Sequence, residues 1–137
     1  MSHTEPLSTV LDKIVRKFVD MCGKAVQDVV IARSDGLVVY SYSTSLNPTQ
    51  RRSIAALISL LMGSSKKIYS QLRDDELVSI IMEGRRSKII LKSITLPSGR
   101  DVYVSVLVSS VDEGEPNIGL ILLMLDNLVE KLREVFR

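Results

Sequence analysis

The spacing of apolar residues changes between a helical and a strand period along this chain, and the order of these changes restricts the fold more than any other feature. Apolar residues recur at three- and four-residue steps in segments 7–22, 48–72 and 116–137, which predicts three amphipathic helices. The other apolar runs are rich in β-branched residues and predict strands, which we place at residues 29–33, 37–43, 77–83, 87–96 and 102–109. The expected order is helix, two strands, helix, three strands and helix.

Turn and capping residues support these boundaries. Asp35-Gly36 favours a tight hairpin turn between the first two strands, because both residue types tolerate positive φ. Asn47 can cap the second helix, and the proline that follows it loses no hydrogen bond that the helix needs. The start of the last helix is ambiguous, because residues 118–125 could form a buried strand. Helical spacing continues beyond that run and favours a helix from about Pro116.

Three of the predicted strands are almost continuously apolar, which bears on how the sheet is covered. Residues 29–32, 77–82 and 102–108 contain few polar side chains, whereas a strand with one face in water alternates between apolar and polar residues. Helices are therefore expected on both faces of the sheet. We accordingly expect a three-layer α/β/α domain that comprises residues 1–137, with residues 1–6 as a flexible tail.

The helix expected at 48–72 is apolar over an arc of roughly 200°, and a single sheet face needs little more than half of that. The excess predicts a partner, and a second copy of the chain is the favoured candidate. A stripe of small residues on another side would let a second backbone approach closely. The apolar arc consists of Ile54, Leu57, Ile58, Leu60, Leu61, Met62, Ile68, Tyr69 and Leu72, and the small stripe of Ala56, Ser59, Gly63 and Ser70.

Composition and length exclude several classes of protein. The 137 residues have a net charge of +2, which is too small an excess to predict nucleic-acid binding. Cys22 is the only cysteine, so no internal disulfide can form and nothing indicates an oxidising compartment. The first residues lack the pattern of a signal peptide, and the longest apolar run, 118–125, is far shorter than the about 20 residues that span a bilayer. We therefore expect a cytoplasmic protein without membrane insertion.

Residues that could perform catalysis or hold a cofactor are scarce. The only histidine, His3, lies in the expected tail and is not placed to activate Cys22 or a serine. One cysteine and one histidine cannot complete a zinc site, and the acidic clusters at 74–76 and 112–115 lack the spacing of a calcium loop. No glycine-rich phosphate-binding loop is present. We therefore expect no catalytic residue, no metal site and no cofactor.

Basic residues cluster at 51–52, 66–67 and 85–88. Apart from Tyr69, no aromatic side chain that could stack on a base lies close to these clusters. We interpret them as solvated surface rather than as a nucleic-acid site. Charge at 85–88 can also discourage unwanted pairing at the edge of a sheet.

Several segments, in this order, resemble the roadblock family of the dynein light-chain type. Residues 29–39 (Val-Val-Ile-Ala-Arg-Ser-Asp-Gly-Leu-Val-Val) resemble its first hairpin. Residues 54–57 (Ile-Ala-Ala-Leu) and 60–63 (Leu-Leu-Met-Gly) resemble its alanine-rich second helix, and residues 116–120 (Pro-Asn-Ile-Gly-Leu) resemble the entry into its last helix. The resemblance extends from about residue 7 to about residue 135.

The resemblance implies an architecture and a mode of assembly. The five-stranded sheet would be mainly antiparallel, with the middle helix on one face and both terminal helices on the other. The chain would be a stand-alone prokaryotic member that pairs its second helices and joins its edge strands, here the strand at 77–83, either with itself or with a roadblock paralogue. The residues expected in this dimer interface are Ile54, Leu57, Ile58, Leu61 and Ile80.

The resemblance also implies a function. Roadblock proteins bind Ras-like small GTPases as activators or anchoring platforms, and others link motor subunits, commonly without a catalytic residue of their own. This chain is therefore expected to be a non-enzymatic scaffold that binds a Ras-like GTPase and influences its nucleotide state or location. Partner contact is expected on the exposed flank of the paired second helices, at Arg52, Ala56, Ser59 and Gly63.

Two other functions stay open on the sequence alone. One is a structural subunit of a larger complex that contains no GTPase. The other is a small-molecule sensor of the PAS or GAF kind, which needs a pocket with converging polar groups between sheet and helix. The chain offers few polar candidates for such an interior, namely Ser79, Ser93 and Ser105. A small enzyme is the least favoured class.

Overall fold

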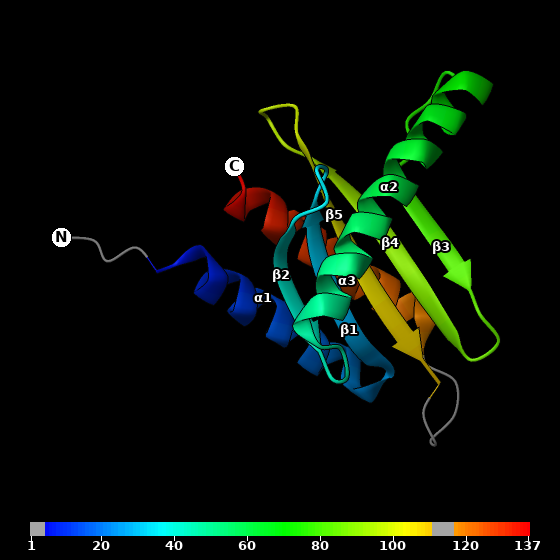
Figure 1. Cartoon of the computed structure of the whole chain (residues 1–137). Coiled ribbons are helices and arrows are strands. Elements are labelled where there is room, and N and C mark those ends of the chain that lie inside the picture. Colours follow the sequence, from blue (N-terminus) through cyan, green and yellow to red (C-terminus); the bar gives the residue numbers. More distant parts are fainter. Residues whose placement is uncertain (1–4, 111–116) are drawn as a thin grey trace.

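The computed structural model describes residues 5–110 and 117–137, and in this part of the chain three α-helices accompany a five-stranded sheet (Figure 1). A short 3-10 helix, Gly23–Ala25, joins the first helix to the first strand. The predicted order of helices and strands is confirmed. The elements are α1 (Leu7–Cys22), β1 (Val26–Arg33), β2 (Val38–Ser43), α2 (Pro48–Leu72), β3 (Ser79–Glu83), β4 (Ser87–Thr95), β5 (Asp101–Ser109) and α3 (Ile118–Val135).

The sheet is antiparallel throughout, with the strand order β2-β1-β5-β4-β3. The β1–β2 hairpin and the β3–β4–β5 meander meet where β1 pairs with β5, so the first strand of the chain lies beside the last one at the centre of the sheet. The two edges are β2 and β3. The position of β3 at an edge matters for function, because the outer side of such a strand can pair with another chain.

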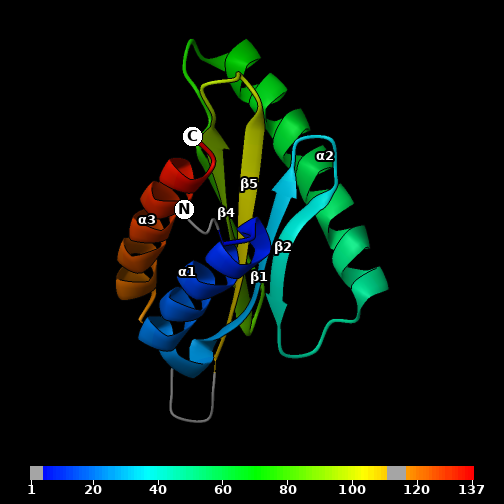
Figure 2. The same ribbon diagram turned by 90° about the vertical axis from the view of Figure 1, so that its left-hand side faces the viewer.

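Helices cover both faces of the sheet, as expected. Figure 2 shows α1 and α3 side by side on one face and α2 alone on the other. Successive β1 side chains explain this arrangement, because Val29 and Ile31 join the core under α1 and α3 while Val30 and Ala32 join the core under α2. The smaller core under α2 consists of Val30, Ala32, Ala55, Ile58, Met62, Leu91 and Tyr103.

Capping hydrogen bonds fix where the helices begin. The Asn47 side chain accepts a hydrogen bond from Gln50 N at 2.8 Å, and the Gln50 side chain accepts one from Asn47 N at 3.0 Å, which completes a capping box at the start of α2. The predicted start of this helix is therefore confirmed, and it ends at Leu72 as predicted. Asn117 caps α3 in the same way by accepting from Leu120 N at 3.0 Å, so residues 118–125 begin a helix rather than a strand.

Some expectations concern residues outside the described ranges. These are His3, most of the tail expected at residues 1–6, the acidic cluster at 112–115 and the helix start expected at Pro116. Among the helices that the structure describes, none is both long enough and apolar enough to cross a membrane.

Candidate protein-interaction surface

One side of α2 exposes large apolar side chains to solvent. Leu57 is 61% exposed, Ile68 59% and Leu72 75%. With the partly buried Ile54 and Leu61 they lie on the same side of the helix, at steps of three, four and seven residues. We call these five residues the α2 apolar stripe. A contiguous apolar patch on a small protein is typical of an interface with another macromolecule.

The edge strand β3 lies next to this stripe. Among the strands that the structure describes, β3 pairs with β4 alone, and Ile81 and Met82 are exposed at 51% and 37%. Ile80 faces α2 and packs partly against the core beneath that helix, as Leu61 does from the helix side. Because Leu61 and Ile80 pack against the same core, we take the stripe and the open edge together and call them the α2–β3 surface. Figure 1 shows where α2 and β3 lie in the fold.

The five residues expected in the dimer interface differ in how far the structure exposes them to solvent. Leu57 is open to solvent, and Ile54, Leu61 and Ile80 are partly buried at the margin of the α2 core. Ile58 is only 6% exposed and packs within the core of its own chain, so it does not lie on the α2–β3 surface. Periodicity identifies an apolar arc but not the side of it that faces the sheet, so the sequence alone does not distinguish Ile58, which is buried within its own chain, from its exposed neighbour Leu57.

The residues expected to contact a partner other than a second copy also differ in exposure. Ser59 is 8% exposed, and its Oγ lies 2.7 Å from the carbonyl oxygen of Arg33 and 3.0 Å from that of Ala55, to which it donates. A Cβ built on Gly36, in the β1–β2 turn, would lie 3.5 Å from Ala56 Cα. The expectation of an exposed flank is therefore wrong at Ser59, because the backbone that approaches this side of α2 belongs to the same chain. Arg52 is exposed and Gly63 is partly exposed.

Lys66 anchors the second half of α2 to the sheet. Its Nζ lies 2.5 Å from Asp101 Oδ2 and 2.6 Å from Ser93 Oγ, and 5.3 Å from the centre of the Tyr103 ring. Burial and, to a smaller extent, the Asp101 carboxylate raise the pKa of Tyr103. The interpretation of residues 66–67 as solvated surface is thus wrong for Lys66. Lys66 also donates a hydrogen bond to the hydroxyl of Ser93, one of the polar groups considered for a small-molecule pocket.

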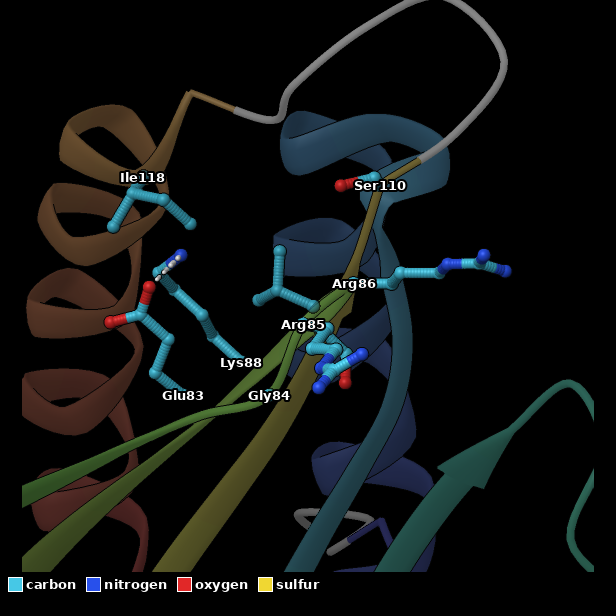
Figure 3. A pocket seen from close by; sticks show the side chains of 9 residues that line it. Glu83, Gly84, Arg85, Arg86, Lys88, Ser110 and Ile118 are labelled. Carbon is cyan, nitrogen blue, oxygen red and sulfur yellow. Dashed lines mark ion pairs between the residues drawn. The ribbon is translucent and has the colours of Figure 1, made fainter.

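A second feature next to the open edge is the basic turn between β3 and β4. Figure 3 shows Glu83 and Lys88 directed toward each other near Ile118, while Arg86 points away from them. Lys88 Nζ lies 3.7 Å from Glu83 Oε1. Arg85 and Arg86 are exposed and form no ion pair with any residue that the structure describes.

The side chains best suited to catalysis are either protonated at neutral pH or hydrogen-bonded to other side chains. Burial raises the pKa of the Cys22 thiol to about 11, so the thiol is protonated at neutral pH. Tyr40 OH donates to Asp12 Oδ1 at 2.6 Å, which links β2 to α1 and lowers the pKa of Asp12. Within the described residues, no group of three or more His, Cys, Asp or Glu side chains could hold a metal ion.

Comparison with known proteins identifies the family. The Roadblock/LC7 domain model matches residues 22–95, which include all of α2 and β3. No match was found among curated proteins. Similar solved structures include MglB from Myxococcus xanthus (15% identity, TM-score 0.79, 99% of this chain and 94% of that chain covered). The gliding protein MglB from Thermus thermophilus has 9% identity and a TM-score of 0.78, with 99% of this chain and 95% of that chain covered.

A Roadblock/LC7 domain from Streptomyces avermitilis is similar as well, with 19% identity, a TM-score of 0.71 and coverage of 95% of this chain and 97% of that chain. At these identities the structures demonstrate a shared fold. The family model matches more than half of the sequence and confirms the resemblance drawn from its motifs. The chain belongs to the Roadblock/LC7 domain family.

Proposed function

We propose that this protein is a homodimeric scaffold that binds a Ras-like small GTPase and influences its nucleotide state or its location, without a catalytic residue of its own. The observation that carries the proposal is the α2–β3 surface, where exposed leucine and isoleucine side chains adjoin an unpaired edge strand. Membership of the roadblock family supports the GTPase as partner. We place the protein in the cytoplasm, where such a partner would be met.

A second copy of the chain fits the α2–β3 surface on physical grounds. Pairing β3 with its copy would satisfy backbone groups that otherwise face water, and it would bring the two α2 apolar stripes together across the pair. Full burial of a leucine side chain contributes about 1.5–3 kcal/mol. Leu57 is the most favourable contributor, because it is 61% exposed in the single chain and lies near the middle of the helix.

The GTPase would bind the face that the two α2 helices present together. Arg52 is exposed near the start of α2, where its guanidinium can meet an acidic surface on the partner. Such a contact contributes only about 0–1 kcal/mol while it stays in water. Ser59 is less suited to this role, because it is buried and its Oγ donates to Arg33 O. Ala56 is exposed and remains available beside Arg52.

The experiment that tests this function is affinity capture of the tagged chain from extract of its native cells, in parallel with GDP and with a non-hydrolysable GTP analogue. Recovery of a Ras-like GTPase in one nucleotide state supports a regulator that senses the nucleotide. Equal recovery in both states supports an anchoring platform. Recovery of stable partners that include no GTPase in either state contradicts the proposal and favours a structural subunit.

A further inference from the structure

Clusters of opposite charge lie at the two ends of the exposed edge strand β3. Asp74, Asp75 and Glu76 precede the strand, and Arg85 and Arg86 follow it in the turn to β4. All five side chains are exposed. Figure 1 shows the connection from α2 and the β3–β4 turn at opposite ends of the strand, so one chain cannot bring the clusters together.

These charges have no ion-pair partner among the residues that the structure describes. Other charges nearby are paired, as Lys66 is with Asp101 and Lys88 with Glu83. The acidic cluster lies at one end of β3 and the two arginines at the other. Lys67 lines the same surface depression as Asp75 and Glu76 but forms no ion pair with them, so both clusters are available to opposite charge from outside the chain.

A second copy supplies that charge if the two β3 strands pair antiparallel. In an antiparallel pair the first residues of one strand lie opposite the last residues of the other. A two-fold axis near Ile80 or Ile81 would place the segment that carries Asp75 and Glu76, which precedes the strand, at the same end of the strand pair as the turn that carries Arg85 and Arg86. Symmetry repeats this juxtaposition of opposite charges at the other end.

We propose that the two clusters form a charge clasp, in which Asp74, Asp75 and Glu76 of one copy pair with Arg85 and Arg86 of the other at both ends of a continuous sheet. The inference rests on the proposed dimer. It adds a reason why the chain selects a second copy as partner and why the two β3 strands run antiparallel. Parallel pairing would set the acidic clusters against each other and is disfavoured. A paralogue without this pattern of charges would pair more weakly, so the clasp favours the homodimer.

The clasp makes dimerisation dependent on ionic strength. Exposed charge pairs are screened when the Debye length falls from about 10 Å at 0.1 M salt to about 3 Å at 1 M. The apolar contacts of α2 are not weakened in this way. The dimer dissociation constant should therefore rise with sodium chloride concentration, and this salt dependence should disappear when the clasp is removed.

Two charge-reversed variants test the clasp. The first variant carries Arg85→Glu and Arg86→Glu, and the second carries Asp74→Lys, Asp75→Lys and Glu76→Lys. Either variant alone places like charges at both ends of the strand pair, so the dimer dissociation constant is expected to rise at least about tenfold. In an equimolar mixture of the two variants, each end again joins opposite charges, and a mixed dimer of nearly wild-type affinity is expected.

The readout is sedimentation velocity together with native mass spectrometry, since the two variants differ in mass, and circular dichroism verifies the fold of each. Lys24→Glu with Lys131→Glu is the matched control, because both lysines are exposed and lie on other elements. A second control replaces Asp112, Glu113 and Glu115 by neutral residues, which tests these carboxylates as alternative partners of the two arginines. Both control proteins should dimerise as the wild type does.

The outcomes are distinct. A wild-type chain that stays monomeric overturns the proposed dimer and the clasp with it. If the wild type dimerises and the charge-reversed variants dimerise with unchanged affinity, the clasp is overturned and the proposed dimer stands. The same holds if each variant dimerises more weakly but the mixture forms no mixed dimer. Loss of dimer in the control that lacks Asp112, Glu113 and Glu115 would assign the arginines to those carboxylates instead and overturn the clasp.

Discussion

Lys66 Nζ lies 2.5 Å from Asp101 Oδ2, and this contact joins the second half of α2 to the first residue of β5. Both side chains are about one-fifth exposed, so the pair is only partly screened by water. The α2 apolar stripe continues past this point through Ile68 to Leu72. The ion pair therefore holds the outer part of the stripe in a defined position relative to the sheet.

Replacement of Lys66 by methionine should lower the free energy of unfolding by about 1–3 kcal/mol, because Asp101 loses its partner while the aliphatic packing stays. The matched variant Lys67→Met alters an exposed neighbour and should change stability by less than about 0.5 kcal/mol. Urea unfolding at one fixed protein concentration measures both. Equal stability of the two variants would show that the ion pair contributes nothing.

If the proposed dimer forms through the α2 apolar stripe, Leu57→Asp should leave the chain monomeric at micromolar concentration without loss of fold. Two carboxylates, one from each copy, would enter the apolar contact, and a cost of about 3 kcal/mol corresponds to a more than hundredfold rise in the dissociation constant. Leu123→Asp on α3 is the control, because Leu123 is 58% exposed and Leu57 61%. Light scattering after size exclusion separates the two cases, and an unchanged mass for Leu57→Asp would remove Leu57 from the interface.

Two glycine-to-alanine substitutions should change the stability of the protein in opposite directions. Gly36 adopts φ +94°, and alanine there should destabilise the protein by about 1–2 kcal/mol because of backbone strain, although the new Cβ would make only ordinary contacts. Gly63 lies inside α2 with no atom near an added Cβ, so alanine should stabilise the helix by up to about 1 kcal/mol. Thermal unfolding of the two variants measures the difference. A destabilised Gly63→Ala protein would contradict the open environment of this residue.

Alkylation of Cys22 should be slow at neutral pH and should accelerate toward pH 11, because burial raises the pKa of the thiol from 9.0 to about 11. The sign for stability follows from the same shift. The raised pKa contributes stability that is present below pH 9 and is lost as the pH rises from 9 through 11. Cys22→Ser should flatten this alkaline decline, which denaturant unfolding at several pH values measures. Rapid alkylation of the folded protein at pH 7 would contradict the burial.

Local signals in the sequence were sufficient for the elements but not for the side of α2 that faces the sheet. Asn47, Pro48 and the apolar spacing that continues to Leu72 are local signals, and they predict a helix at residues 48–72, which are the limits that the structure has. Ile58 and Leu57 are equally apolar and adjacent, and only packing against Leu91 and Val30 distinguishes the buried one. The contact of Lys66 with Asp101 spans 35 positions and has no local signature.

The two edges of the sheet differ, and the difference determines how many copies can associate by strand pairing. Both α1 and α2 pack against β2, and Arg16 lies over the ring of Tyr42 at that edge, whereas β3 leaves Ile81 and Met82 exposed. A subunit that pairs through both edges would polymerise into a fibre. In the proposed dimer only β3 is used, and its one free side is consumed in the first encounter, so strand pairing through β3 alone ends at two chains.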